Sequence, residues 1–101
     1  MLDTKDIRER IESDFGDQAS EVVRIFDQGI SKADYLNNDR IIRCILYLSD
    51  KNIEKLKTYI QAATTDPRDV MYWAEYINHE QPEKTKRIRD FTKPFNEAGL
   101  T

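Results

Sequence analysis

The sequence predicts an all-α fold: a compact bundle of about five helices, with two consecutive helical hairpins at its centre, followed by a C-terminal helical arm. Apolar residues recur every three or four positions along most of the chain, which is the period of one helix face. Strand-type alternation is nearly absent. The 101 residues include only three glycines and three prolines, and most of these lie where a helix is expected to begin or end.

The first two helices are each predicted to end at a glycine. Thr4 is the expected N-cap of the first helix. The buried face of that helix carries three apolar residues at a spacing of four, Ile7, Ile11 and Phe15. Gly16 is expected to end it, because glycine adopts the left-handed conformation after a helix at least cost. A second helix is predicted over about residues 18–28, with Gly29 as its terminator.

The third helix, predicted over about residues 39–49, is the most apolar part of the chain. Its N-cap is expected at Asn37 or Asn38. Just before it, Tyr35 and Leu36 are expected to pin a polar connection to the core. Well over half of the helix circumference is apolar, through Ile41, Ile42, Cys44, Ile45, Leu46, Tyr47 and Leu48. We therefore expect this helix to lie at the centre of the bundle.

The fourth and fifth helices are separated by a sharp start signal. The fourth follows the polar turn of residues 49–52, and its apolar face carries Ile53, Leu56, Ile60 and Ala63. Asp66 is the expected N-cap of the fifth helix, accepting a hydrogen bond from the backbone N–H of Asp69, and Pro67 occupies the first helical position. This helix is expected to end within residues 78–82. Short links predict that helices three, four and five run roughly antiparallel to their neighbours.

Two regions are predicted along the chain. Residues 1–81 form a helical domain, and residues 82–101 form a mildly basic C-terminal helix and arm. A short helix is expected near residues 83–92, because Pro94 prevents its continuation. The rest of this arm is expected to be partly disordered.

Charge is unevenly distributed between these regions. Residues 1–39 carry ten acidic and five basic side chains, net −5, whereas residues 40–81 carry six of each. Residues 82–101 carry three acidic and five basic side chains, net +2. Proteins that bind nucleic acid or anionic membranes normally show a basic stripe, which the body of this chain lacks. We therefore expect a protein partner, or a second copy of the chain, rather than nucleic acid or a membrane.

Cys44 is the single cysteine, so the chain cannot form an internal disulfide. Its apolar neighbours predict a buried, small apolar residue rather than a reactive one. The first six residues lack the apolar core of a signal peptide, and no apolar run approaches membrane-spanning length. These features predict a cytoplasmic location.

The residues that could carry catalysis are few. His79 is the only histidine, and its expected place beside a helix end favours an exposed residue that interacts with the helix dipole. One histidine and one cysteine in separate helices cannot supply the usual zinc ligand set. A glycine-rich phosphate loop is also absent from the sequence. We therefore predict no catalytic residue, no cofactor and no metal.

The fifth helix carries more aromatic surface than one buried face requires. Val70, Ala74 and Ile77 make the expected core face. Five other residues form a candidate interaction patch: Arg68, Tyr72, Trp73, Glu75 and Tyr76. Tyrosine, tryptophan and arginine are the residues most enriched at interface hot spots, so this patch is the predicted contact surface.

A purely structural interpretation of the same residues is also open. The two tyrosines of the patch then cover neighbouring helices, and its arginine and glutamate form a local pair. If Arg40 and Arg43 of the third helix lie beside the fifth helix, Asp66, Asp69 or Glu75 can bridge to them across the hairpin.

Two segments of this chain resemble a known group of proteins. They are Arg40-Ile41-Ile42-Arg43-Cys44-Ile45-Leu46, and Asp66-Pro67-Arg68-Asp69-Val70 followed by Trp73-Ala74-Glu75-Tyr76. The pattern is similar to that of short uncharacterised bacterial all-helical proteins of about this length, and it covers most of residues 1–78. The resemblance implies a bacterial source and an all-helical fold. It implies no activity, and no functional residue can be transferred through it.

The sequence therefore favours a non-catalytic, protein-interaction or self-associating helical module. Self-association is the simplest case, because the arm offers Ile88, Phe91 and Phe95 for exchange between copies. One alternative is a regulatory nucleic-acid binder that uses the basic cluster Lys84, Lys86, Arg87 and Arg89. Another is a small helical enzyme, in which a pocket would join Cys44 or His79 to Arg68 and Glu75.

Overall fold

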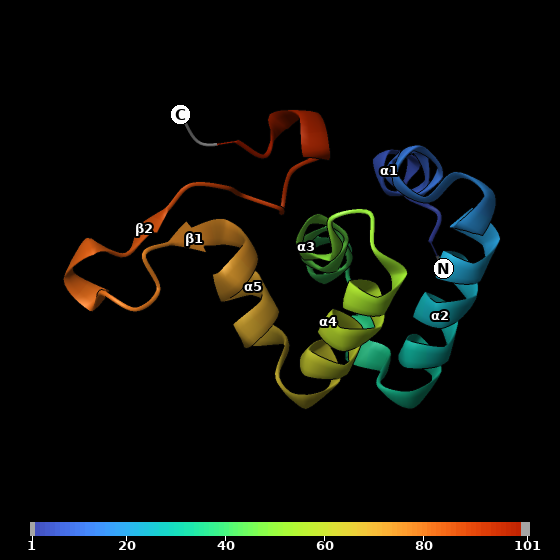
Figure 1. Cartoon of the computed structure of the whole chain (residues 1–101), viewed down its shortest axis with the longest axis horizontal. Coiled ribbons are helices and arrows are strands. Elements are labelled where there is room, and N and C mark those ends of the chain that lie inside the picture. Colours follow the sequence, from blue (N-terminus) through green and yellow to red (C-terminus); the bar gives the residue numbers. More distant parts are fainter. Residues whose placement is uncertain (1, 100–101) are drawn as a thin grey trace.

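The computed structural model of the chain describes residues 2–99 as a row of helices followed by a short hairpin and an irregular C-terminal segment (Figure 1). The helices are α1 (Lys5–Phe15), α2 (Ala19–Lys32), α3 (Asp39–Ser49), α4 (Ile53–Thr65) and α5 (Pro67–Glu75). The hairpin strands are β1 (Tyr76–Ile77) and β2 (Lys86–Arg87), which pair antiparallel. Short 3₁₀ turns lie at Gly16–Gln18, Asp34–Leu36, Pro82–Lys84 and Phe95–Glu97.

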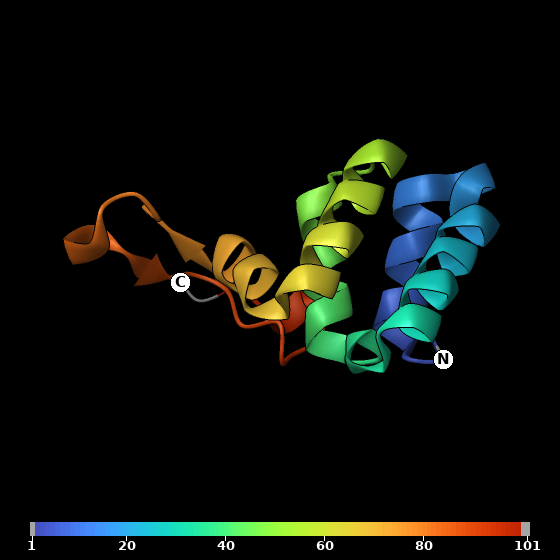
Figure 2. The same cartoon turned by 90° about the horizontal axis from the view of Figure 1, so that it is seen from below.

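The helical character and the central position of α3 are confirmed. α3 packs against α1, α4 and α5, and α2 packs against α1 and α4. The longest dimension of the molecule is 41 Å, and the hairpin projects beyond the helices along it (Figure 2). None of the helices formed by residues 2–99 has the length and apolar character that crossing a membrane requires.

The N-caps of α3, α4 and α5 are made by side chains. Asn38 accepts hydrogen bonds from the backbone N–H groups of Arg40 and Ile41, and Asn52 accepts one from Lys55. Asp66 caps α5 as predicted, but its carboxylate accepts from the N–H of Arg68 rather than that of Asp69. These caps satisfy donors that the first turn of a helix leaves unpaired.

Thr4 lies at the N-cap position of α1 as predicted, but its side chain does not cap the helix, and the predicted end of α2 is wrong. Thr4 precedes α1 without a side-chain cap, because its hydroxyl instead donates to Asp39 Oδ2 at 2.7 Å and ties the start of α1 to the start of α3. α2 continues through Gly29 to Lys32. A Cβ at position 29 would lie 3.1 Å from Ile60 Cγ2, a tight contact, so this glycine allows α4 to approach closely and does not act as a terminator. Gly16 does end α1, with a φ of 50°.

The connection before α3 is held in two different ways. Leu36 is buried, as predicted. Tyr35 is exposed, so the prediction that its ring is pinned to the core is wrong. Its hydroxyl donates a hydrogen bond to the carbonyl of Thr64, which attaches the connection to the end of α4.

The predicted C-terminal helix over residues 83–92 is wrong. α5 ends at Glu75, and the chain then makes the β1–β2 hairpin and returns to the helices as an irregular segment, residues 88–99, which we call the strap. The backbone carbonyl of Glu75 accepts hydrogen bonds from the N–H groups of Ile88 and Arg89, at 2.7 and 3.1 Å. These N–H groups therefore attach the strap to the end of α5 and do not form helical hydrogen bonds.

The strap packs against the helices through part of its length. Asp90 N–H donates to the Ala98 carbonyl at 2.7 Å, and Arg89 forms an isolated β-bridge with Gly99, so the two ends of the strap meet. Phe91 and Ala98 are buried in a cluster with Cys44 and Ala74. Residues 100–101, on which the prediction of disorder also falls, lie outside the described residues.

Candidate functional site

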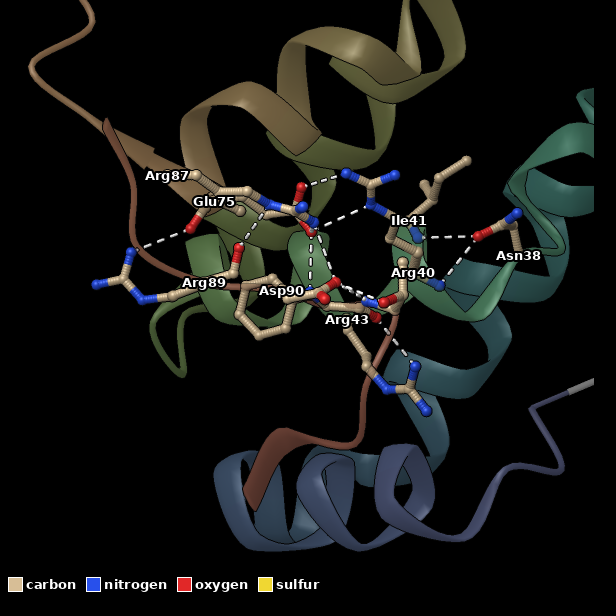
Figure 3. A network of polar contacts seen from close by, with 11 residues as sticks. Asn38, Arg40, Ile41, Arg43, Glu75, Arg87, Arg89 and Asp90 are labelled. Atoms are coloured by element: carbon tan, nitrogen blue, oxygen red, sulfur yellow. Dashed lines mark hydrogen bonds and ion pairs between the residues drawn. The ribbon is translucent and has the colours of Figure 1, made fainter. Parts of the chain in front are cut away.

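Glu75, the last residue of α5, is fully buried and lies at the centre of a polar network (Figure 3). Arg40 of α3 binds its carboxylate with two guanidinium nitrogens, one of them Nε at 3.1 Å from Oε2. The N–H of Phe91 donates to the same Oε2 at 2.9 Å, and Arg87 Nη2 lies 3.6 Å from it. An acidic residue at a helix C-terminus is electrostatically unfavourable, and these donors offset that.

Asp6 of α1 repeats this arrangement on the other side of α3. Arg43 Nε and Nη2 each donate to one of its carboxylate oxygens at 3.0 Å. The N–H of Phe95 donates to Oδ2 at 3.1 Å. The pKa of Asp6 is lowered, chiefly by the hydrogen bond from Arg43 and further by that from the Phe95 backbone, both of which favour the ionised form.

The two arginine–carboxylate pairs hold the strap through the backbone N–H and the backbone carbonyl of the same residue, Phe91. Glu75 takes the N–H of Phe91, and Arg43 Nη1 donates to the Phe91 carbonyl at 3.0 Å. Arg43 itself is only 5% exposed. We call Asp6, Arg40, Arg43 and Glu75 the carboxylate latch. All four side chains are occupied in fixing the strap to α1, α3 and α5, which is a structural task.

Cys44 lies beneath the strap. It clusters with Phe91 and Ala98, and the Tyr47 and Phe91 rings meet at 5.5 Å beside it. Burial raises the pKa of the Cys44 thiol to about 12, with a smaller contribution from the negative charge of Glu75. Because the thiolate is the nucleophilic form of cysteine, this thiol is unreactive at neutral pH. The predicted burial of Cys44 is confirmed.

His79 lies in the hairpin loop and not beside a helix end, because α5 ends at Glu75, four residues before it. Its Nε2 is 2.6 Å from the Tyr76 carbonyl. Its ring contacts that of Tyr72 in a tilted arrangement with centroids 4.9 Å apart, and Tyr72 in turn contacts Tyr76 at 5.4 Å. The hydroxyl of Tyr72 is 3.4 Å from that of Thr85, so this aromatic row supports the hairpin.

The structure separates the five residues of the predicted patch. Glu75 is buried and cannot belong to a surface, so its inclusion was wrong; the alternative bridge from Glu75 to Arg40 is confirmed. Arg68 points to the start of α5, where it pairs with Asp66 and remains 84% exposed. Tyr72 and Tyr76 face the hairpin. Trp73 faces α4 instead.

Trp73 forms one wall of an open groove between α4 and α5, which we call the α4–α5 groove. Its ring meets that of Tyr59 edge-on at 6.2 Å and remains 38% exposed. The groove encloses about 670 Å³ and is lined by Leu48, Glu54, Lys55, Thr58, Tyr59, Ala62, Trp73 and His79. The lining is mostly apolar, and its two charged residues, Glu54 and Lys55, lie on α4.

Sequence reasoning identified Trp73 but missed the α4 half of this groove. Tyr59 and Ala62 lie outside the predicted buried face of the fourth helix. A large aromatic side chain outside the buried face, here Tyr59, is the sequence feature that could have indicated a second contact surface.

The basic cluster of the arm is partly consumed within the chain. Arg87 binds Asp90 at 3.0 Å and the Arg89 carbonyl at 3.1 Å. Arg89 donates to the Ala74 carbonyl at 3.0 Å, and its guanidinium lies 4.3 Å from the centre of the Tyr47 ring. Only Lys84 and Lys86 of that cluster extend into solvent, because both are exposed.

Comparison of the chain with protein-family models, with curated proteins and with solved structures found no match. The bacterial resemblance and the cytoplasmic location therefore stay predictions from the sequence.

Proposed function

We propose that this chain is a non-catalytic protein-interaction module that binds a protein partner in the α4–α5 groove. The observation that carries the proposal is Trp73, whose ring lies on the groove wall with 38% of its surface exposed. Tryptophan and tyrosine in a concave apolar site are the usual anchors of binding energy at interfaces. The matching partner presents a large apolar side chain from an otherwise polar segment.

The contrast with the carboxylate latch supports a binding role. Arg40, Arg43, Asp6 and Glu75 have the charge and burial of functional groups, yet each is bonded within the chain. Cys44 is buried and its thiol has a raised pKa. The apolar surface of the groove is what the fold leaves without a covering element.

The test uses Trp73→Ala as bait beside the wild-type chain in affinity capture from the native cell, followed by mass spectrometry. A groove partner is enriched on the wild type and lost on the variant. Tyr35→Ala is the matched control, because Tyr35 is an exposed aromatic residue outside the groove lining. Circular dichroism of both variants confirms that the helices remain.

Trp73 also reports binding directly, since it is the only tryptophan. Adding the purified partner to the wild type is expected to shift the tryptophan emission to shorter wavelength as the ring loses water. A partner retained equally by wild type and Trp73→Ala contradicts the proposal. Capture that weakens steeply with salt and is lost in Lys84→Ala with Lys86→Ala favours the nucleic-acid alternative instead.

A further inference from the structure

The hairpin that carries the strap has a very short strand pairing. β1 and β2 contribute two residues each, pairing Tyr76 with Arg87 and Ile77 with Lys86. The hairpin projects beyond the helices (Figure 2), where Tyr72 of α5 contacts His79 and Thr85 of its loop. Within the loop, Asn78 donates to the Lys84 carbonyl and Thr85 to the Asn78 carbonyl, so opening the loop breaks these bonds. Isolated two-stranded hairpins of this size have little stability of their own.

The strap, in contrast, is firmly docked, and its docking contacts all cross from the strap to the helices. The N–H groups of Phe91 and Phe95 bind Glu75 and Asp6, and the Phe91 carbonyl binds Arg43. Phe91 fills the cluster around Cys44. Nothing in these contacts requires that the strap and the helices belong to the same copy of the chain.

The loop between the strands is a suitable hinge. Asn78 has a φ of 59°, in the left-handed region, which asparagine adopts at a smaller cost than most residues; this cost is relieved if the loop extends. Pro82 lies in the middle of the loop. Residues 78–85 reach up to roughly 26 Å when extended, at about 3.3 Å a residue.

We propose that two copies of this chain form a dimer by exchanging their straps. The hairpin loop opens, β1 of one copy pairs with β2 of the other, and each strap docks on the carboxylate latch of its partner. Continuing the Tyr76–Arg87 register through the opened loop places Gln81 opposite Pro82 of the second copy. The pairing is therefore symmetric about a two-fold axis, as a closed dimer requires.

Each docked strap makes the same latch contacts in the monomer and in the exchanged dimer. The equilibrium between them is therefore decided by the loop rather than by the latch. The exchange uses neither Tyr59 nor Trp73, so Trp73→Ala is expected to leave it unchanged. Opening the loop does move His79, which lines one end of the α4–α5 groove, so exchange changes that end of the groove.

A disulfide across the strand pair distinguishes exchange from simple side-by-side association. The variant carries Ile77→Cys and Lys86→Cys in a Cys44→Ala background, because antiparallel partners lie within disulfide distance. The protein is equilibrated at rising concentrations in urea below the unfolding transition, oxidised, and run on a non-reducing gel. Exchange gives a covalent dimer whose fraction rises with concentration. Disulfides that remain within one chain at every concentration overturn the proposal.

Variants at Asn78 test the hinge without new cysteines. Asn78→Val and Asn78→Gly both lose the side-chain hydrogen bond to the Lys84 carbonyl, but only valine is strongly disfavoured at positive φ. Light scattering is expected to give a dimerisation constant at least about tenfold larger for Asn78→Val than for Asn78→Gly. Opening the loop relieves the unfavourable positive φ of valine, and two loops open in each dimer. Equal constants, or strict monomers in both variants, contradict exchange through this loop.

Discussion

The strap interface and the α4–α5 groove differ in whether their residues have partners within the chain. At the strap, Glu75 and Asp6 each bind an arginine of α3 and a backbone N–H. At the groove, Trp73 and Tyr59 meet mainly each other and leave an open apolar wall.

This difference separates folding from binding. Buried charge in a small protein first suggests chemistry, but here it fixes an irregular segment to three helices and is already satisfied. An exposed aromatic wall contributes less to folding and remains available to a partner. Mutations in the two regions should therefore have different effects. Mutations at the strap should cause large losses of stability, and mutations in the groove should cause losses of partner binding.

Phe91→Ala is expected to cause the largest loss of stability, about 4 kcal/mol, as for other phenylalanines removed from a well-packed core. Phe91 is 2% exposed, and its removal opens the cluster over Cys44. Urea unfolding measures the loss, and faster labelling of Cys44 by a thiol reagent reports the opened strap. Trp73→Ala, the aromatic truncation in the groove, should cost clearly less; equal costs would remove the distinction between the regions.

Glu75→Ala is expected to cost about 3 kcal/mol, because it leaves Arg40 and the Phe91 N–H without their acceptor. The shift of the urea midpoint at constant slope measures this loss. Glu54→Ala is the control, since Glu54 pairs with Lys57 in solvent and its removal should change stability by less than about 0.5 kcal/mol. Similar losses of stability at both positions would show that the buried Arg40–Glu75 pair contributes no more to stability than an exposed pair.

Asp6→Asn is expected to cost about 1.5 kcal/mol at neutral pH, through weakened charged hydrogen bonds. The pKa of Asp6 is lowered from 3.8 in the folded state, chiefly by Arg43, so its stabilising contribution is present above that value. It is lost as pH falls below 3.8 through the lower folded-state pKa. The stability difference between wild type and Asp6→Asn, measured by urea unfolding, should thus shrink below pH 3.8; a difference independent of pH would contradict this role.

Arg68→Ala should have the smallest effect on stability, because its pair with Asp66 is exposed to solvent. Thermal unfolding followed by circular dichroism suffices to measure it. A larger loss would mean that Asp66 depends on Arg68 to cap α5. Binding of a groove partner should also be unchanged in this variant, since Arg68 does not line the groove.

The helices could be predicted from the sequence because their signals are local. Apolar periodicity placed α3 at the centre, and Asn38 and Asp66 marked two helix starts correctly. Gly29 shows the limit of such signals. Some glycines end a helix, and others, such as Gly29, allow two helices to pack at short distance. A single sequence does not distinguish the two kinds.

The strap could not be predicted, because its contacts join residues far apart in sequence through backbone atoms. Every residue except proline has the same N–H, so nothing in the sequence marks Phe91 and Phe95 as the partners of Glu75 and Asp6. The candidate patch failed for a related reason. Grouping Tyr72, Glu75 and Tyr76 by helical spacing assumed that α5 continues, whereas it ends at Glu75.

The bond between Asp6 and Phe95 has a consequence for how the chain folds during synthesis. It joins positions 89 residues apart, so α1 and its attachment to the strap are completed only after residue 95 has left the ribosome. Closing so long a loop is slow compared with forming the local α3–α4–α5 contacts. Those three helices should therefore gather first, and the latch should close last, as the final kinetic step of folding.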